Sequence, residues 1–155
     1  MADREGNQEA GLKSKVLDAR APKTFAVIFE TADEVAAGLA AFAKEAHLAA
    51  SHFTAIGALS SVVLGYFDWQ LKKYKRIEIG EQVEVLSCIG DVALENNEPK
   101  VHAHMVVGKS DGSAWGGHLL EARVRPTLEV ILVESPEHLR KRFDPESGLA
   151  LIRLE

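Results

Sequence analysis

The chain has 155 residues, of which 46% are hydrophobic and 26% are charged, and this composition is typical of one compact globular domain. Its net charge of −5 argues against a protein that binds nucleic acid over its whole surface, because such proteins carry a basic excess. No apolar run approaches the roughly 20 residues that cross a bilayer, no secretory signal opens the chain, and the single cysteine excludes an internal disulfide, so we expect a cytoplasmic protein without membrane contact.

The chain is predicted to begin with a flexible tail. Residues 1–20 mix both charge signs with Gly, Asn and Gln and show no apolar period. We therefore expect a single domain over residues 21–155. Its first element is a strand at residues 24–30, which are β-branched and aromatic.

One amphipathic helix follows this strand. Thr31 and Glu34 have the spacing of a capping box, and from Val35 onward apolar residues recur at helical spacing. The pattern predicts a helix that ends near His47. Gly38 inside the helix is unfavourable relative to alanine by about 1 kcal/mol, so it predicts a close approach of the helix backbone to the sheet.

The rest of the chain is predicted to be strands, which gives an α/β (α+β) fold with a largely antiparallel sheet of about seven strands. Gly57 leaves open whether its flanking segments are two strands or one bent strand. One helix cannot cover both faces of such a sheet, so the uncovered face must close on itself or meet other subunits. The predicted strands are 51–56, 59–67, 74–79, 83–94, 100–109, 113–120, 127–133 and 149–154, with a short helical turn at 136–142.

Chemically distinctive residues concentrate in residues 98–127, which hold three of the six histidines. His102 and His104 form an H-x-H pair on a predicted strand, where residues two apart point to the same face. Two imidazoles at this spacing are half of a common transition-metal site, and a third ligand must come from a neighbouring strand. His118 is the candidate for that ligand.

The register of the intervening hairpin decides whether His118 reaches the pair. A three-residue loop of residues 110–112 places His104 opposite His118, with their Cβ atoms about 5 Å apart. A two-residue Asp-Gly turn places His104 opposite Leu119 instead, and the histidines then diverge unless the following Gly-Gly pair forms a bulge. Both registers are compatible with the sequence.

Three histidines around one metal leave coordination positions open, as in catalytic sites, so this stretch predicts a divalent transition metal, with zinc favoured. The alternative is a polar strand face whose histidines hydrogen-bond to neighbours. Glu121 and Arg125 are candidate catalytic residues: the carboxylate as a base or as an orienter of a histidine, the guanidinium as a grip for an anion. An ion pair is the alternative for these two residues. His52, on another predicted strand, is a candidate fourth participant.

Five segments of the chain carry a resemblance to a known family. They read HFTAIGAL (52–59), LGYFD (64–68), EVLSCIGDVAL (84–94), VHAHMVVG (101–108) and GGHLLEARVRPTLEV (116–130). In this order they resemble the plants-and-prokaryotes conserved (PPC) domain, also called DUF296, and the resemblance covers about residues 24–134.

The resemblance implies an α/β fold with one main helix, assembled as a homotrimer. In plants the domain follows an AT-hook, whose R-G-R-P core inserts into the minor groove of AT-rich DNA, whereas prokaryotic members are single-domain proteins commonly described as DNA-binding. This chain contains no R-G-R-P. Its histidines at 52, 102, 104 and 118 match the prokaryotic pattern, and members of this type look able to hold a metal there.

Three functional hypotheses follow from the sequence. The first is a trimeric DNA-binding or regulatory protein that also holds a metal at its histidines, by resemblance to the family. The second is a metal-dependent enzyme of hydrolase or lyase type that acts on a small anionic substrate. The third is a scaffold that binds protein partners and keeps an inactive site.

Overall fold

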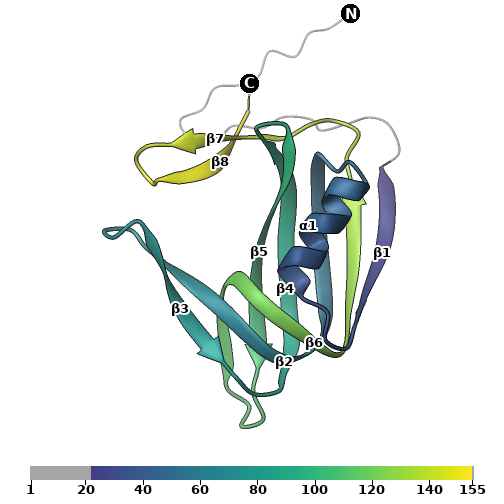
Figure 1. Ribbon diagram of the computed structural model, residues 1–155, viewed down its shortest axis with the longest axis vertical. Helices are drawn as coiled ribbons and strands as arrows, with labels where there is room; N and C mark the ends of the chain where they lie inside the picture. Colours follow the sequence, from purple (N-terminus) through teal and green to yellow (C-terminus); the bar gives the residue numbers. More distant parts are fainter. Residues whose placement is uncertain (1–21, 155) are drawn as a thin grey trace, which may run out of the picture.

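The computed structural model describes residues 22–154, so the tail predicted at residues 1–20 lies outside the described residues. The described chain forms eight strands and one helix, which confirms a mostly β protein with one main helix and is close to the predicted sheet of about seven strands (Figure 1). The elements are β1 (Lys23–Glu30), α1 (Val35–Glu45), β2 (Ala50–Asp68), β3 (Lys73–Ile79), β4 (Val83–Glu95), β5 (Glu98–Gly108), β6 (Ala114–Glu134), β7 (Arg140–Asp144) and β8 (Leu149–Arg153).

All eight strands join one sheet, and their pairings are antiparallel except for the parallel contact between β4 and β7. β2 pairs with β6 along one edge and with β4 and then β3 along the other. Because β4 pairs with β5 and β5 pairs with β6, the strands β2, β4, β5 and β6 form a closed circuit. The largely antiparallel sheet is therefore confirmed, and the circuit gives it an inner and an outer face.

Two strands of the sheet are unusually long. β2 is one bent strand, which is one of the two alternatives left open at Gly57, and its register with β4 and β6 shifts there without ending the strand. β6 joins the two strands predicted at 113–120 and 127–133, because its residues pair with β2 on both sides of the Arg125–Pro126 step. Gly57 and the Arg125–Pro126 step are thus irregularities within long strands and do not end them.

The helix α1 lies on the sheet with the predicted apolar stripe inward, and Val35, Leu39 and Ala43 are buried. The predicted capping box is wrong about Thr31. Glu34 alone caps the helix, with its Oε2 accepting a hydrogen bond from Ala37 N at 2.6 Å, while the hydroxyl of Thr31 donates to the carbonyl of Pro126 on β6. Strand pairing between β1 and β6 has drawn Thr31 away from the helix start.

The close approach predicted at Gly38 is confirmed, since a Cβ there would lie 2.3 Å from Cε1 of Phe29 on β1. The helical turn predicted at 136–142 is wrong. Its residues lead into β7, because Leu139 N donates to the carbonyl of Ala49 and the carbonyl of Leu139 accepts from Leu94 N, so that this segment joins the end of the sheet. The helix has 11 residues, and no helix in the described part of the chain is long and apolar enough to span a membrane.

The core fills the space inside the strand circuit and beneath α1. Each fully buried side chain of leucine size contributes roughly 1.5–3 kcal/mol relative to exposure, so this core is the main source of fold stability. It places the backbones of β5 and β6, whose outer faces carry the three clustered histidines. The largest fully buried side chains include Phe53, Leu59, Leu64, Met105, Leu128 and Leu132.

We predict that the Cys88 thiol is unreactive in the folded protein. The side chain is 1% exposed, and burial raises the pKa of Cys88 to about 11, so the reactive thiolate is nearly absent at pH 8. Ellman's reagent should label the native protein far more slowly than the protein in guanidinium chloride. Equal rates in the two conditions would contradict the burial of Cys88.

Candidate metal centre

The histidines of β5 share the outer face of the sheet. His102 and His104 are exposed, while Ala103 between them is buried on the inner face. The hairpin to β6 has the three-residue loop, because Lys109 N donates to Ser113 O at 2.9 Å. His104 therefore lies directly opposite His118, which confirms the register that brings the histidines together.

The three imidazoles converge on one point. His102 Nε2 and His104 Nε2 are 3.2 Å apart. The ring centroid of His118 lies 5.2 Å from that of His102 and 5.4 Å from that of His104. One nitrogen from each ring can be chosen so that all three lie within 4.8 Å of one another, which is the arrangement of a three-histidine metal site.

Two observations show that a transition-metal ion fits these residues. Zinc–nitrogen bonds of about 2.0–2.1 Å in tetrahedral geometry separate two ligand nitrogens by roughly 3.3 Å, close to the 3.2 Å between His102 and His104. His118 Nδ1 is buried and has no hydrogen-bond partner among the described residues, and such an atom is costly unless something binds it. A set of neutral imidazoles suits zinc, copper, iron and nickel rather than magnesium or calcium.

The electrostatics of the cluster keep the imidazoles ready to bind a cation. Burial, together with the positive charges of His102, His104 and Lys141, lowers the pKa of His118 to about 4. Burial and the charge of His102 also lower the pKa of His104. Because a metal binds the unprotonated ring, both shifts reduce the competition from protons at neutral pH.

The metal-free protein should lose stability as the pH falls from about 6.5 to 4. In this range the unfolded chain protonates His118 near its ordinary pKa of about 6.5, whereas the folded chain does not, so protons favour unfolding. Urea unfolding in EDTA at pH 7.5 and pH 5 measures the loss. His118→Asn, which cannot protonate, should show a smaller loss, and equal losses in the two proteins would contradict the lowered pKa.

Tyr74 on β3 holds the ring of His118 from one side. The two rings are stacked, with centroids 4.6 Å apart and an interplanar angle of 24°. His118 pairs with Gly65 of β2, and Gly65 pairs with Arg76 of β3, so His118 and Arg76 share the outer face. The stack fixes the ring orientation that a metal ligand requires.

Glu121 also lies on the outer face. A register shift in β6 pairs Glu121 with Val63 of β2, and Val63 lies two residues from Gly65, which pairs with His118. Glu121 Oε1 accepts a hydrogen bond from Arg76 Nη2 at 2.8 Å, so the predicted base lies beside the cluster in an ion pair. Arg125 is exposed and follows His118 by seven residues, roughly 20 Å along an extended strand. The structure brings Glu121, but not Arg125, near the histidines.

Two cavities flank the cluster, and His104 lines both. One, of about 410 Å³, also contains His52 and Asp91, so His52 borders the site without joining the three converging rings. The other has a volume of about 530 Å³ and opens along His118. Its remaining wall is mostly apolar or glycine: Gly65, Tyr66, Phe67, Ser87, Ile89, Met105, Val106, Gly116 and Gly117.

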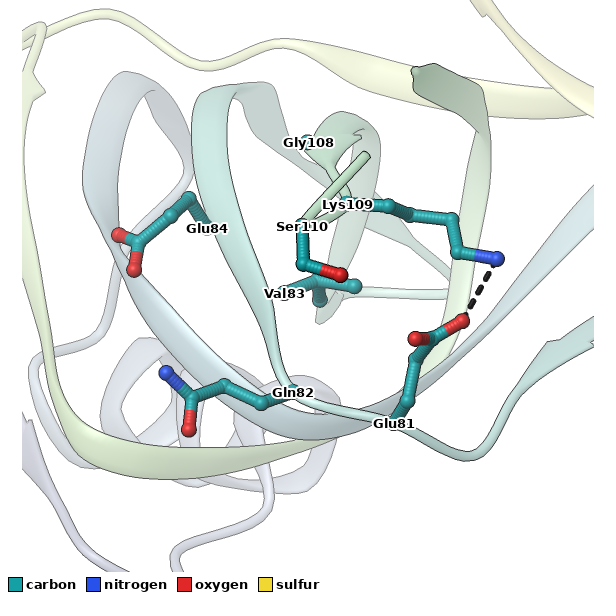
Figure 2. A pocket seen from close by; sticks show the side chains of 7 residues that line it. All are labelled: Glu81, Gln82, Val83, Glu84, Gly108, Lys109 and Ser110. Atoms are coloured by element: carbon teal, nitrogen blue, oxygen red, sulfur yellow. Dashed lines mark ion pairs between the residues drawn. The ribbon is translucent and has the colours of Figure 1, made fainter. Parts of the chain in front are cut away.

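A third cavity, of about 400 Å³, lies at the far end of the β5–β6 hairpin and contains no histidine (Figure 2). Here Lys109 Nζ lies 2.6 Å from Glu81 Oε1 and 5.5 Å from the ring centroid of Trp115. The ion pair ties the start of the hairpin loop to the β3–β4 connection.

Sequence reasoning missed two charged residues behind the cluster, Asp91 on β4 and Lys141 on β7. Asp91 Oδ2 lies 3.5 Å from His102 Nδ1, and Asp91 Oδ1 lies 3.3 Å from Lys141 Nζ. A signal for Asp91 was present, because a two-residue turn at Asn96 and Asn97 sets Asp91 opposite His102. No local pattern marked Lys141.

The comparisons with known proteins agree with this fold. A model of the Plants and Prokaryotes Conserved (PCC) domain matches residues 17–136. A metal-containing protein from Archaeoglobus fulgidus is 34% identical with a TM-score of 0.81, covering 91% of this chain and all of its own. A plant- and prokaryote-conserved (PPC) protein from Pyrococcus horikoshii is 31% identical, with a TM-score of 0.80 and coverage of 87% and 94%.

Two further similarities concern proteins with other descriptions. A candidate DNA-binding protein from Bacteroides thetaiotaomicron is 28% identical with a TM-score of 0.81, covering 86% of this chain and 96% of its own. The bifunctional protein GlmU of a Synechococcus strain is 30% identical over 117 residues, which is 74% of this chain. The chain spans only 18% of the length of that curated relative.

Proposed function

Because the chain belongs to the Plants and Prokaryotes Conserved (PCC) domain family, we propose that it is a metal-binding member whose His102, His104 and His118 hold one divalent transition-metal ion, zinc in the first instance. The observation that carries the proposal is the convergence of these three imidazoles from β5 and β6. The orphaned Nδ1 of His118 supports it, and so does the description of the Archaeoglobus fulgidus relative as metal-containing.

The alternative within this proposal is a metal-dependent enzyme of hydrolase or lyase type. A bound zinc ion would supply a Lewis acid that polarises a substrate oxygen or acidifies a coordinated water. The histidine rings leave coordination positions open toward the two cavities, and the larger cavity has a mostly apolar wall.

Charged residues beside the cluster suit a small anionic substrate. Glu121 is the proposed base or orienter, and its partner Arg76 is partly exposed on the same outer face. An anion at the cluster would meet Arg76 first and release Glu121 from the ion pair. We keep Arg125 as a candidate anion-binding residue only for a substrate long enough to extend along β6 from the histidines to Arg125.

We also propose that the protein is a homotrimer. Three isoleucines, Ile28, Ile56 and Ile131, are 50–60% exposed on the outer face, opposite the face that packs against α1. An apolar patch of this kind is typical of a subunit interface. Sedimentation equilibrium should give three times the chain mass, and a monomer that persists at micromolar concentration would contradict the proposal.

Elemental analysis tests the metal proposal. The protein, purified without a histidine tag and dialysed against metal-free buffer, should retain close to one equivalent of zinc or another transition metal per chain. Metal-depleted protein should regain that equivalent when zinc is returned. Protein that takes up no stoichiometric metal under saturating conditions would refute the assignment.

A DNA-associated function is the second candidate, because the Bacteroides thetaiotaomicron relative is described in that way. Exposed Lys73 and Lys75 on β3 form a short basic stretch, but the chain as a whole carries a charge of −5. This function predicts binding to AT-rich duplex that weakens as salt rises. Absence of a complex at low salt would refute it.

A further inference from the structure

A nearly buried lysine from the C-terminal hairpin reaches the back of the histidine cluster. The side chain of Lys141, on β7, is 8% exposed, and its ammonium lies 3.3 Å from Asp91 Oδ1. Burying an ammonium group is costly unless an opposite charge is close. The carboxylate of Asp91 supplies that charge.

The hairpin of β7 and β8 holds Lys141 in place from both ends. At one end Arg140 pairs with Leu94 of β4 and donates a hydrogen bond from Nη1 to Asn97 Oδ1 at 2.8 Å. At the other end Lys72, in the β2–β3 turn, donates to the carbonyl of Glu146. Figure 1 shows the hairpin and the β2–β3 turn on the same side of the molecule. Lys141 therefore lies on a hairpin that is held at both ends.

The second oxygen of the same carboxylate faces a histidine of the cluster. Asp91 pairs with His102 across β4 and β5, and its Oδ2 lies 3.5 Å from His102 Nδ1. The opposite nitrogen, His102 Nε2, faces His104 Nε2 at 3.2 Å. An Nδ1–H directed at the carboxylate leaves the Nε2 lone pair directed into the cluster.

Asp91 lies between the two residues. Its Oδ1 faces the ammonium of Lys141 at 3.3 Å, and its Oδ2 faces His102 Nδ1 at 3.5 Å. Carboxylates that accept from the outer nitrogen of a metal-bound histidine raise the basicity of the ligand and fix its tautomer.

We propose that Asp91 and Lys141 are positioning residues for His102: Lys141 fixes the carboxylate of Asp91, and the carboxylate holds His102 as the Nδ1–H tautomer with Nε2 free to bind metal. The inference rests on the proposed metal function. Lys141 lies beyond residues 17–136, which match the family model, so this support comes from the chain's C-terminal hairpin.

The tautomer of His102 tests the pair without any metal. In metal-depleted, full-length protein at pH 8, long-range ¹H–¹⁵N NMR should show His102 as a single Nδ1–H tautomer. Asp91→Asn and Lys141→Met should each shift His102 toward a mixture with the Nε2–H form. A wild-type His102 that is already a mixture, or a tautomer unchanged in both variants, would overturn the proposal.

Zinc affinity, measured by chelator competition, gives the second readout. Asp91→Asn should weaken zinc binding about 10- to 100-fold, as loss of an outer-shell partner does. Lys141→Met should weaken it several-fold and Lys141→Arg should restore it. If Lys141 acted only as a nearby positive charge, its removal would tighten zinc binding, and that result would contradict a positioning role.

Lys44→Met is the matched control. It removes a lysine from an ion pair of the same length, 3.3 Å to Glu98 Oε2, that is exposed and involves α1 rather than the cluster. It should leave both the tautomer and the zinc affinity unchanged. If Asp91→Asn or Lys141→Met unfolds, the double variant Asp91→Asn/Lys141→Met replaces it, because this variant leaves no unpaired buried charge. His102 should then show the same mixture of tautomers. A single tautomer of His102 in the double variant would overturn the proposal.

The two proposals fail in different ways. If the wild-type protein binds no zinc but keeps the single His102 tautomer, the metal function is wrong and the positioning pair stands. If zinc binds stoichiometrically and its affinity is unchanged in Asp91→Asn and Lys141→Met, the positioning pair is wrong and the metal function stands.

Discussion

The double substitution His102→Ala/His104→Ala abolishes stoichiometric metal binding. It removes two of the three imidazole nitrogens that converge at the centre and leaves His118 as a single ligand. The loss of affinity should far exceed the roughly 10- to 100-fold that removal of an outer-shell partner causes. Because both side chains are exposed on the outer face, the urea midpoint of the metal-free protein should change little.

The matched control is His47→Asn/His138→Ala, which also removes two exposed histidines, both outside the cluster. Asparagine is used at position 47 because that residue has a positive φ of 53°, which asparagine tolerates. Isothermal titration with zinc after metal depletion measures both variants. Stoichiometric zinc that survives His102→Ala/His104→Ala would show that the metal binds elsewhere.

Gly90→Ala should be the most damaging small substitution near the centre. A Cβ at Gly90 would lie 2.3 Å from Cζ of Phe53, which is 2% exposed, and 2.5 Å from the carbonyl oxygen of His102. Neither neighbour can move freely, because Phe53 is packed in the core and the carbonyl belongs to the β5 backbone. Overpacking of this kind costs about 1–3 kcal/mol.

The same substitution should weaken zinc binding, because relief of the clash shifts the backbone that carries His102 and the adjacent Asp91. Gly80→Ala is the matched control, since a Cβ at Gly80 would meet nothing within 4 Å. Urea unfolding and zinc titration of the two variants should separate them clearly. A Gly90→Ala protein as stable as Gly80→Ala would contradict the packing described between β2, β4 and β5.

The sequence predicted most of the sheet because its strands alternate or are rich in β-branched residues, and it predicted α1 from the buried stripe that begins at Val35. It placed a false break before Pro126 and left a break at Gly57 open, because local signals there compete with long-range pairing. In the structure β2 and β6 pair with each other across both positions. Pairing partners are distant in sequence, so a local pattern cannot show that the strands continue.

The histidine cluster was predictable because one hairpin loop sets its geometry, and counting from residues 110–112 places His104 opposite His118. The same counting from the Asn96–Asn97 turn finds Asp91 opposite His102. Lys141 could not be found in this way. Its position depends on where the C-terminal hairpin docks, which is determined by contacts from β4 to the β2–β3 turn.

Anomalous diffraction at the zinc absorption edge, from crystals grown with one equivalent of zinc, shows directly whether the three histidines bind one metal ion. We expect one strong peak per chain, about 2.0–2.1 Å from a ring nitrogen of each of His102, His104 and His118. A peak bound by other residues, or no peak among these three rings, would contradict it.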